Sequence, residues 1–91
     1  MISAGIPNAA RKAVYRRDGY RCALCDSPKY IQIHHVVHRS LGGTDFPENL
    51  ITLCSDCHAA AHGIRLPGYA HMDEADMTLA CEEYLSSLEG V

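Results

Sequence analysis

The sequence lacks features that would place it among membrane or secreted proteins. No stretch approaches the roughly 20 consecutive apolar residues that a membrane-spanning helix needs. Residues 1–10 lack a positively charged segment followed by an apolar run, so we expect no secretory signal and a location in the reducing cytoplasm. Internal repeats and low-complexity tracts are also missing. With 91 residues, we expect one domain over residues 1–91 and no membrane partner.

A chain of this length also lacks the means to build a large core. It buries only about 60% of the surface that its unfolded form exposes. Small domains therefore usually add disulfides or a metal ion, and the five cysteines are the candidates here. In a reducing compartment, closely spaced cysteines are more often metal ligands than disulfide partners. Five cysteines fit four ligands plus one further thiol.

Basic residues are almost missing from the second half of the chain. The net charge is −3, yet residues 1–45 carry seven Lys or Arg against three acidic residues, and residues 46–91 carry one against eight. Such a chain can present a basic face to phosphate. An ordinary solvated surface would show the same pattern, so charge alone does not decide the function.

Apolar spacing and helix-capping residues predict helix, strand, loop, strand, helix and helix in that order. We expect Asn8 and Ser55 to be the N-caps of the first two helices. The last helix has an apolar stripe that includes Cys81, which would pack in the core or form a symmetric dimer. The predicted ranges are helix 9–18, strand 30–37, loop 40–49, strand 50–53, helix 55–62 and helix 73–89.

Four cysteines form two Cys-x-x-Cys pairs, at Cys22 and Cys25 and at Cys54 and Cys57. A two-residue gap lets both thiolates of one turn reach the same tetrahedral Zn²⁺. The 28 residues between the pairs exceed the usual zinc-ribbon spacing, so the chain carries an insertion there. Four thiolates leave no position open for water, which predicts a structural zinc.

Other readings of these cysteines are weaker. Residues 54–58, Cys-Ser-Asp-Cys-His, match the attachment pattern of c-type haem, but that chemistry needs export. A thioredoxin-like redox pair at Cys22 and Cys25 lacks a βαβ context. A zinc finger that combines these two cysteines with His58 and His62 fails because about 12 residues should separate the two pairs.

Four histidines have the spacing of a second metal site. His34 and His35 are adjacent in a predicted strand, so their rings should project to opposite faces and differ in role. His58 and His62 are four residues apart on a predicted helix and share one face. Cys57 is turned from His58 by about 100°, so one helix can serve zinc on one side and a second cation on the other.

This ordered set resembles the HNH (His-Asn-His) endonuclease family, in its small phage and bacterial type with two Cys-x-x-Cys pairs. The resemblance extends over residues 11–65 or so, which we take as the core of the domain. The matching features are His34-His35, Asn49 within Pro-Glu-Asn-Leu, His58 and His62 within Cys-His-Ala-Ala-Ala-His, the run Gly42-Gly43-Thr44-Asp45, the two cysteine pairs and the run from Arg16 to Cys22.

The resemblance implies a small α+β protein with the ββα-metal (His-Me finger) fold, a four-cysteine zinc site and flanking N- and C-terminal helices. It also implies an endonuclease or nicking enzyme that hydrolyses phosphodiester bonds in DNA, with His35 as general base. One divalent cation would be held by His34, His58 and His62. Asn49 would hold the loop and orient His35 through a hydrogen bond, although in some relatives the matching Asn reaches the metal.

The metal and the partners follow less directly. Imidazole ligands favour Zn²⁺, Ni²⁺, Co²⁺ or Mn²⁺, whereas availability and turnover favour Mg²⁺ or Mn²⁺, so we expect Mn²⁺ or Mg²⁺ to support activity. Few aromatic residues and no recognition helix predict weak sequence preference, with phosphate contacts from basic side chains. A partner protein, as in phage packaging, is one possible source of specificity that the sequence does not decide. A non-catalytic zinc-knuckle module for DNA or protein is the alternative function. The candidate phosphate ligands are Arg39, Arg16, Arg17, Arg21 and Lys29.

Overall fold

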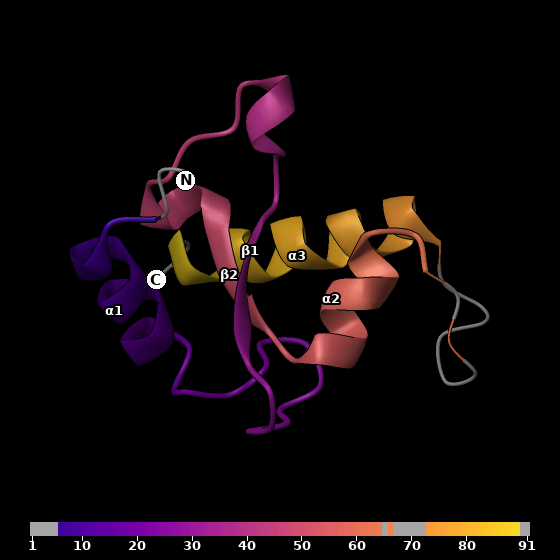
Figure 1. Cartoon of the computed structure of the whole chain (residues 1–91), viewed down its shortest axis with the longest axis horizontal. Coiled ribbons are helices and arrows are strands. Elements are labelled where there is room, and N and C mark those ends of the chain that lie inside the picture. Colours follow the sequence, from indigo (N-terminus) through magenta and orange to yellow (C-terminus); the bar gives the residue numbers. More distant parts are fainter. Residues whose placement is uncertain (1–5, 65, 67–72, 90–91) are drawn as a thin grey trace, which may run out of the picture.

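The computed structural model describes residues 6–64, 66 and 73–89. Within them, three helices surround a two-stranded antiparallel sheet, which confirms the expected small α+β fold with strand, strand and helix in sequence (Figure 1). No described helix is long and apolar enough to cross a bilayer. The elements are α1 (Asn8–Arg17), β1 (Gln32–His35), β2 (Leu50–Leu53), α2 (Ser55–Ala61) and α3 (Glu74–Glu89), with short 3₁₀ turns at Arg39–Leu41 and Pro47–Asn49.

The first helix begins one residue earlier than the sequence predicted. Pro7 occupies the N-cap position, Asn8 is the first helical residue, and no side chain caps this end, so the expected role of Asn8 as N-cap is wrong. Proline suits this place because its fixed φ leads directly into the helix. The helix ends at Arg17, and Gly19 follows with a φ of 75°, a left-handed conformation that favours glycine.

The sheet is small, and its register positions the two adjacent histidines. β2 has the predicted bounds, whereas β1 covers only the middle of the predicted 30–37 strand. Tyr30 has a φ of 52°, so the chain is not extended there. His34 pairs with Ile51 and His35 with Leu50, and His34 is buried while His35 is partly exposed. The two rings therefore lie on opposite faces, as expected from strand geometry.

The core lies between β2, α2 and α3. Met77, Cys81 and Leu85 recur on one face of α3 and are buried in one cluster with Ile51 and Leu53 of β2. Burial also raises the pKa of the Cys81 thiol to about 11, as expected for an apolar core position. The stripe that suggested a dimer is therefore occupied by packing within the chain itself. Figure 1 shows α3 running past both α2 and the sheet.

A buried carboxylate joins three of the elements. Asp18, at the end of α1, accepts hydrogen bonds from the Thr52 backbone N–H in β2 (2.9 Å), from the Tyr84 hydroxyl in α3 (2.8 Å) and from Arg17. Burial alone would raise the pKa of Asp18, but these hydrogen bonds outweigh it and hold that pKa below its usual value. Asp18 thus holds α1 and α3 against β2.

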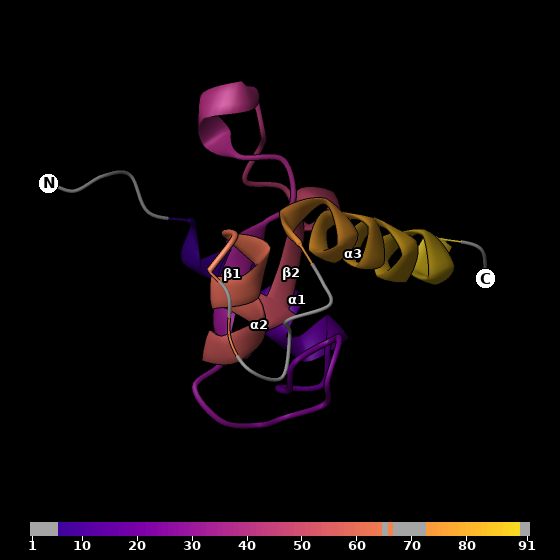
Figure 2. The same ribbon diagram turned by 90° about the vertical axis from the view of Figure 1, so that its right-hand side faces the viewer.

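Between the strands, residues 36–49 form an excursion that stands away from the rest of the molecule (Figure 2). Asn49 closes its base, because its side-chain oxygen accepts from the Val37 N–H (2.9 Å) and its amide nitrogen donates to the Val37 carbonyl (3.0 Å) and the Thr44 carbonyl (2.9 Å). Gly43 packs so closely that a Cβ there would overlap the Val37 carbonyl. Only glycine fits at this crossing.

Replacing Asp18 tests the anchoring role of its carboxylate. Asp18→Asn should lower the free energy of unfolding by about 3 kcal/mol, because buried donors and Arg17 lose their charged acceptor. Since the folded pKa of Asp18 is depressed, its contribution is present above about pH 4 and is lost as the pH falls through the folded pKa. Tyr84→Phe removes one hydrogen bond only and should cost about 1 kcal/mol. Denaturant unfolding that ranks the two variants the other way would contradict this role.

Candidate metal centre and active site

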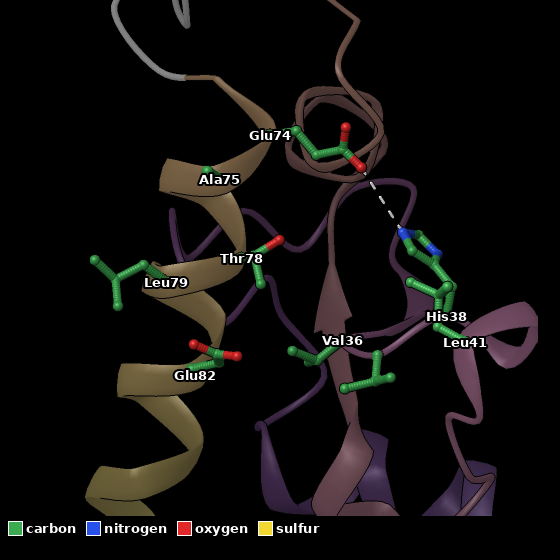
Figure 3. A pocket seen from close by; sticks show the side chains of 9 residues that line it. Val36, His38, Leu41, Glu74, Ala75, Thr78, Leu79 and Glu82 are labelled. Carbon is green, nitrogen blue, oxygen red and sulfur yellow. Dashed lines mark ion pairs between the residues drawn. The ribbon is translucent and has the colours of Figure 1, made fainter.

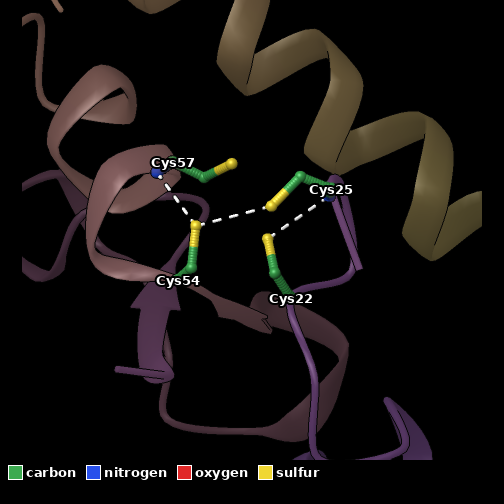
Figure 4. A group of neighbouring side chains, drawn as sticks. All are labelled: Cys22, Cys25, Cys54 and Cys57. Carbon is green, nitrogen blue, oxygen red and sulfur yellow. Dashed lines mark hydrogen bonds between the residues drawn. The ribbon is translucent and has the colours of Figure 1, made fainter. Parts of the chain in front are cut away.

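The four predicted cysteine ligands converge from two chain turns. The sulfurs of Cys22, Cys25, Cys54 and Cys57 all lie within 4.8 Å of one another and point to a common centre (Figure 4). The Cys25 and Cys54 sulfurs are 3.5 Å apart, close to the separation of about 3.8 Å that two thiolates adopt on a tetrahedral zinc ion. The donor set and its spacing are therefore compatible with a structural zinc.

Backbone amides donate hydrogen bonds to two of these sulfurs. The Cys25 N–H donates to the Cys22 sulfur and the Cys57 N–H to the Cys54 sulfur, each at 3.4 Å. A hydrogen bond with Cys57 and further backbone hydrogen bonds lower the pKa of Cys22 to about 4, even though burial opposes this shift. Cys54, and not Ser55 as predicted, is the N-cap of α2, and its sulfur takes the place of the expected hydroxyl.

The second group consists of three imidazoles, one from β1, one from α2 and one from the C-cap of α2. Ligand nitrogens of His34, His58 and His62 also lie within 4.8 Å of one another. Their ring centroids are 5.1 Å apart for His34 and His58, 5.2 Å for His34 and His62, and 4.8 Å for His58 and His62. Rings that bind one tetrahedral ion would stand about 5 Å apart, since each metal–nitrogen bond is about 2.1 Å long. These residues fit a divalent cation.

The surroundings of His34 and His58 favour the uncharged imidazole, which is the form that binds metal. Burial, followed by the neighbouring imidazoles, lowers the pKa of His34 to about 3. Burial and the proximity of His62 also lower the pKa of His58. Gln32 hydrogen-bonds with Nδ1 of His58, while Nε2 of His58 lies 3.2 Å from Nε2 of His62. The Gln32 contact therefore turns Nε2 of His58 into the cluster.

His35 lies at the same cleft and is held by a carboxylate. The cleft has a volume of about 330 Å³, and both His35 and Arg39 line it. Nε2 of His35 is 2.7 Å from Oδ1 of Asp45, and Arg39 contacts both oxygens of Asp45 at 3.1 Å. The hydrogen bond with His35, with further help from Arg39, lowers the pKa of Asp45. A carboxylate on Nε2 favours the tautomer whose Nδ1 can accept a proton.

Comparison with known proteins agrees with this geometry. The HNH endonuclease family model matches residues 22–63, a range that contains both cysteine pairs and the whole histidine group. The type IV methyl-directed restriction enzyme EcoKMcrA of Escherichia coli (strain K12) is 41% identical over 39 residues, which cover 43% of this chain and 14% of the enzyme. Anaredoxin of Nostoc sp. (strain PCC 7120 / SAG 25.82 / UTEX 2576) is 33% identical over 54 residues, which cover 58% of this chain and 71% of that protein.

The chain belongs to the HNH endonuclease family. It matches only a small part of the restriction enzyme and a larger part of anaredoxin. The residues that match the HNH family model end before α3, so this helix lies outside the matched region.

One expectation about the residues around His35 is wrong. Asn49 was expected to orient His35, but among the described residues its side chain bonds only to Val37 and Thr44, and Asp45 is the partner of His35. The sequence carried a signal for this partner, because Asp45 closes the Gly42-Gly43-Thr44-Asp45 run that contributed to the family resemblance.

The predicted phosphate ligands occupy different surroundings. Arg17 was expected to contact DNA, but its three guanidinium nitrogens donate to Asp18 and to the carbonyls of Pro47 and Leu50, so it is a structural residue. Arg39 lines the cleft that His34, His35 and His62 also line. The remaining candidates, Arg16, Arg21 and Lys29, are exposed and do not line it, and Arg21 pairs with Asp26 at 3.1 Å.

His38, to which the sequence assigned no role, also lines this cleft. Its ring centroid lies 5.4 Å from that of His62 and 6.0 Å from that of His34. His38 follows β1 by three residues, a spacing that by itself does not predict that its ring turns back toward the other histidines.

The depressed pKa of His34 predicts a pH dependence of stability when the histidines hold no cation. The unfolded chain takes up a proton near pH 6.5, whereas folded His34 does so only near pH 3, so stability is lost as the pH falls through this window. Between about pH 7 and 5.5 the slope should be at most about 1.4 kcal/mol per pH unit for this group. His34→Gln should flatten the slope in denaturant unfolding of protein that carries one zinc per chain, at the cysteines only. Equal slopes in both proteins would contradict this assignment.

Proposed function

We propose that this chain is a metal-dependent endonuclease or nicking enzyme that hydrolyses phosphodiester bonds in DNA. Its membership of the HNH endonuclease family supports this function. The observation that carries the proposal is the convergence of His34, His58 and His62, with ligand atoms within 4.8 Å, at a cleft that His35 also lines. A cluster of metal ligands beside an imidazole that can accept a proton is suited to metal-assisted hydrolysis.

In this proposal, His34, His58 and His62 hold one divalent cation. When bound, the cation supplies positive charge to the phosphate and to the departing oxygen. His35 removes a proton from the attacking water through Nδ1, since Asp45 occupies its Nε2. Asn49 does not contact the reacting groups and keeps the 36–49 excursion closed, which holds Asp45 beside His35.

The substrate assignment rests on family membership and on the basic side chains. The restriction enzyme EcoKMcrA shares 41% identity over its matched segment, and restriction acts on DNA. Arg39 lies at the cleft, where its charge is suited to a phosphate group, while Arg16 and Arg21 are exposed beyond it. Such contacts position the DNA backbone without reading bases, so we propose weak sequence preference, with any further specificity supplied by a partner protein.

Repeated cleavage is favoured by a cation that binds its ligands weakly enough to release the product. We propose that Mn²⁺ or Mg²⁺ supports cleavage, and that Zn²⁺, Ni²⁺ and Co²⁺ bind the same imidazoles more tightly because imidazole is a softer ligand than oxygen. The four cysteines hold a separate zinc ion whose role is structural, because all four positions of a tetrahedral ion are filled by sulfur.

We further propose that residues 1–91 act as one nuclease domain with a core over residues 11–65 or so; position 65 itself lies outside the described residues. Asp18 supports a single domain, since it links α1 to β2 and α3. Cys81 and Met77 support it too, because they bury α3 against the HNH region.

Loss of the proposed base should abolish cleavage without unfolding the protein. His35→Ala should slow the relaxation of supercoiled plasmid by at least about 100-fold in Mn²⁺ or Mg²⁺, since general-base catalysis contributes about that much or more. The wild-type reaction should stop when EDTA is added. Gel analysis of nicked and linear products also separates a nicking enzyme from one that cuts both strands. A His35→Ala protein that cuts at the wild-type rate would exclude His35 as the base.

Asp45 offers a matched test of how His35 is positioned. Asp45→Asn keeps the size of the side chain but removes the charge on Nε2 of His35, so cleavage should fall and its pH profile should shift. Asp26→Asn is the control, because Asp26 is exposed and pairs only with Arg21 among the described residues. DNA binding without cleavage in every metal tested, including the wild-type protein, would instead favour a non-catalytic zinc-knuckle module.

Removal of the cysteine zinc should unfold the protein. Purified protein should contain one tightly held zinc per chain, and Cys57→Ser should lose both the zinc and the cooperative thermal transition, because the metal replaces a large part of the missing core. Cys81→Ala should keep the zinc, since Cys81 belongs to the apolar cluster and not to the ligand group. Metal analysis and thermal unfolding that find zinc and a normal transition in Cys57→Ser would contradict the assignment.

A further inference from the structure

A fourth imidazole stands beside the three proposed cation ligands. His38 follows β1 and lines the same cleft as His34 and His62. Its ring centroid is 5.4 Å from that of His62, close to the spacing of about 5 Å expected for two rings on one tetrahedral ion. It is 6.0 Å from the ring of His34, about 1 Å more than that spacing. A small rotation of one side chain would therefore bring His38 to the ion.

The side chain of His38 is free to make this rotation, whereas its backbone is fixed. The His38 carbonyl accepts hydrogen bonds from the Leu41 and Gly43 N–H groups, each at 2.9 Å. The side chain is 36% exposed, and among the described residues its only polar partner is Glu74. Rotation about the side-chain torsions therefore breaks no hydrogen bond in the described part of the chain.

Glu74, the first residue of α3, directs its carboxylate toward the ring of His38 (Figure 3). Its Oε2 is 3.8 Å from Nε2 of His38. A metal-bound histidine almost always gives its other ring N–H to a carboxylate, a carbonyl or water, which orients the ring and makes it a stronger ligand. With Nε2 directed to Glu74, Nδ1 of His38 is the nitrogen left for a cation. Gln32 has the corresponding place beside Nδ1 of His58.

We propose that His38 is a fourth imidazole ligand of the cation in the DNA-free protein, and that Glu74 of α3 positions it. The inference rests on the proposed three-histidine cation site but adds a ligand that the HNH resemblance did not include. Four imidazoles favour Zn²⁺, Co²⁺ and Ni²⁺ over Mg²⁺ more strongly than three do. Because α3 lies outside the region that matches the family, this ligand would make the metal preference of the cleft depend on the added helix.

Metal binding without DNA tests the proposal independently of cleavage. With zinc already bound by the cysteines, Ni²⁺ is titrated into the full chain by calorimetry at neutral pH. We expect His38→Ala to weaken Ni²⁺ binding by more than about tenfold and Glu74→Gln to weaken it by about tenfold, the scale on which loss of an outer partner acts. Glu82→Gln is the matched control, because Glu82 lies on the same helix and lines the neighbouring groove but contacts no histidine in the described structure.

A second measurement counts the ligands directly. Co²⁺ is bound in place of Ni²⁺, and proton NMR records the exchangeable ring N–H signals that the paramagnetic ion shifts out of the normal range. Each bound imidazole contributes one such signal from its other nitrogen. We expect four signals in the wild-type protein and three in His38→Ala, with the remaining three retained.

The outcomes separate this inference from the function on which it rests. If wild-type protein binds no ion beyond the cysteine zinc, the three-histidine site and the fourth ligand are both excluded. If His34→Ala abolishes Ni²⁺ binding while His38→Ala binds as tightly as wild type and the Co²⁺ protein shows three signals, the three-histidine site stands and the role of His38 is overturned.

Discussion

The pairing of β1 with β2 places His34 opposite Ile51 and His35 opposite Leu50, and the geometry of the whole site follows from this register. A shift by one residue would exchange the faces of the two histidines, because side chains alternate along a strand. Burial prevents such a shift. All four residues of β2 are buried, so none of its side chains can be turned to solvent without loss of apolar contacts.

The helix that follows β2 links the two ligand groups. α2 has only seven residues; it begins at the cysteine cluster, contains His58 of the histidine cluster and ends at its C-cap, His62. Cys57 is 1% exposed and directed to the sulfurs, whereas the next residue, His58, is directed to the imidazoles. Because a helix this short is not stable alone, its orientation depends on the groups that anchor its ends and its buried face. The cysteines thereby also determine where the imidazoles meet.

Much of this arrangement could be predicted from local patterns, because paired cysteines, adjacent histidines and a four-residue helical spacing are all close in sequence. The bounds of β2 and the pairing of His58 with His62 are examples, whereas the HNH resemblance implied the addition of His34 to that pair. Contacts that depend on the path of a loop could not be predicted. Arg17 binds the carbonyls of Pro47 and Leu50, acceptors that every residue carries and that leave no pattern. His38 meets Glu74 only because α3 packs against α2 and brings its first residue near the loop that follows β1.

The excursion between the strands has a closed base and an open tip. Asn49 ties its two ends together, while Leu41 and Phe46 near its tip are 74% and 64% exposed. Because these two side chains are mostly exposed, they can be replaced with little effect on the buried ligands His34 and Cys57. Evolution or protein engineering can therefore vary these two exposed positions and leave the cysteine and histidine clusters unchanged. Antibodies vary their loops on a constant framework in the same way.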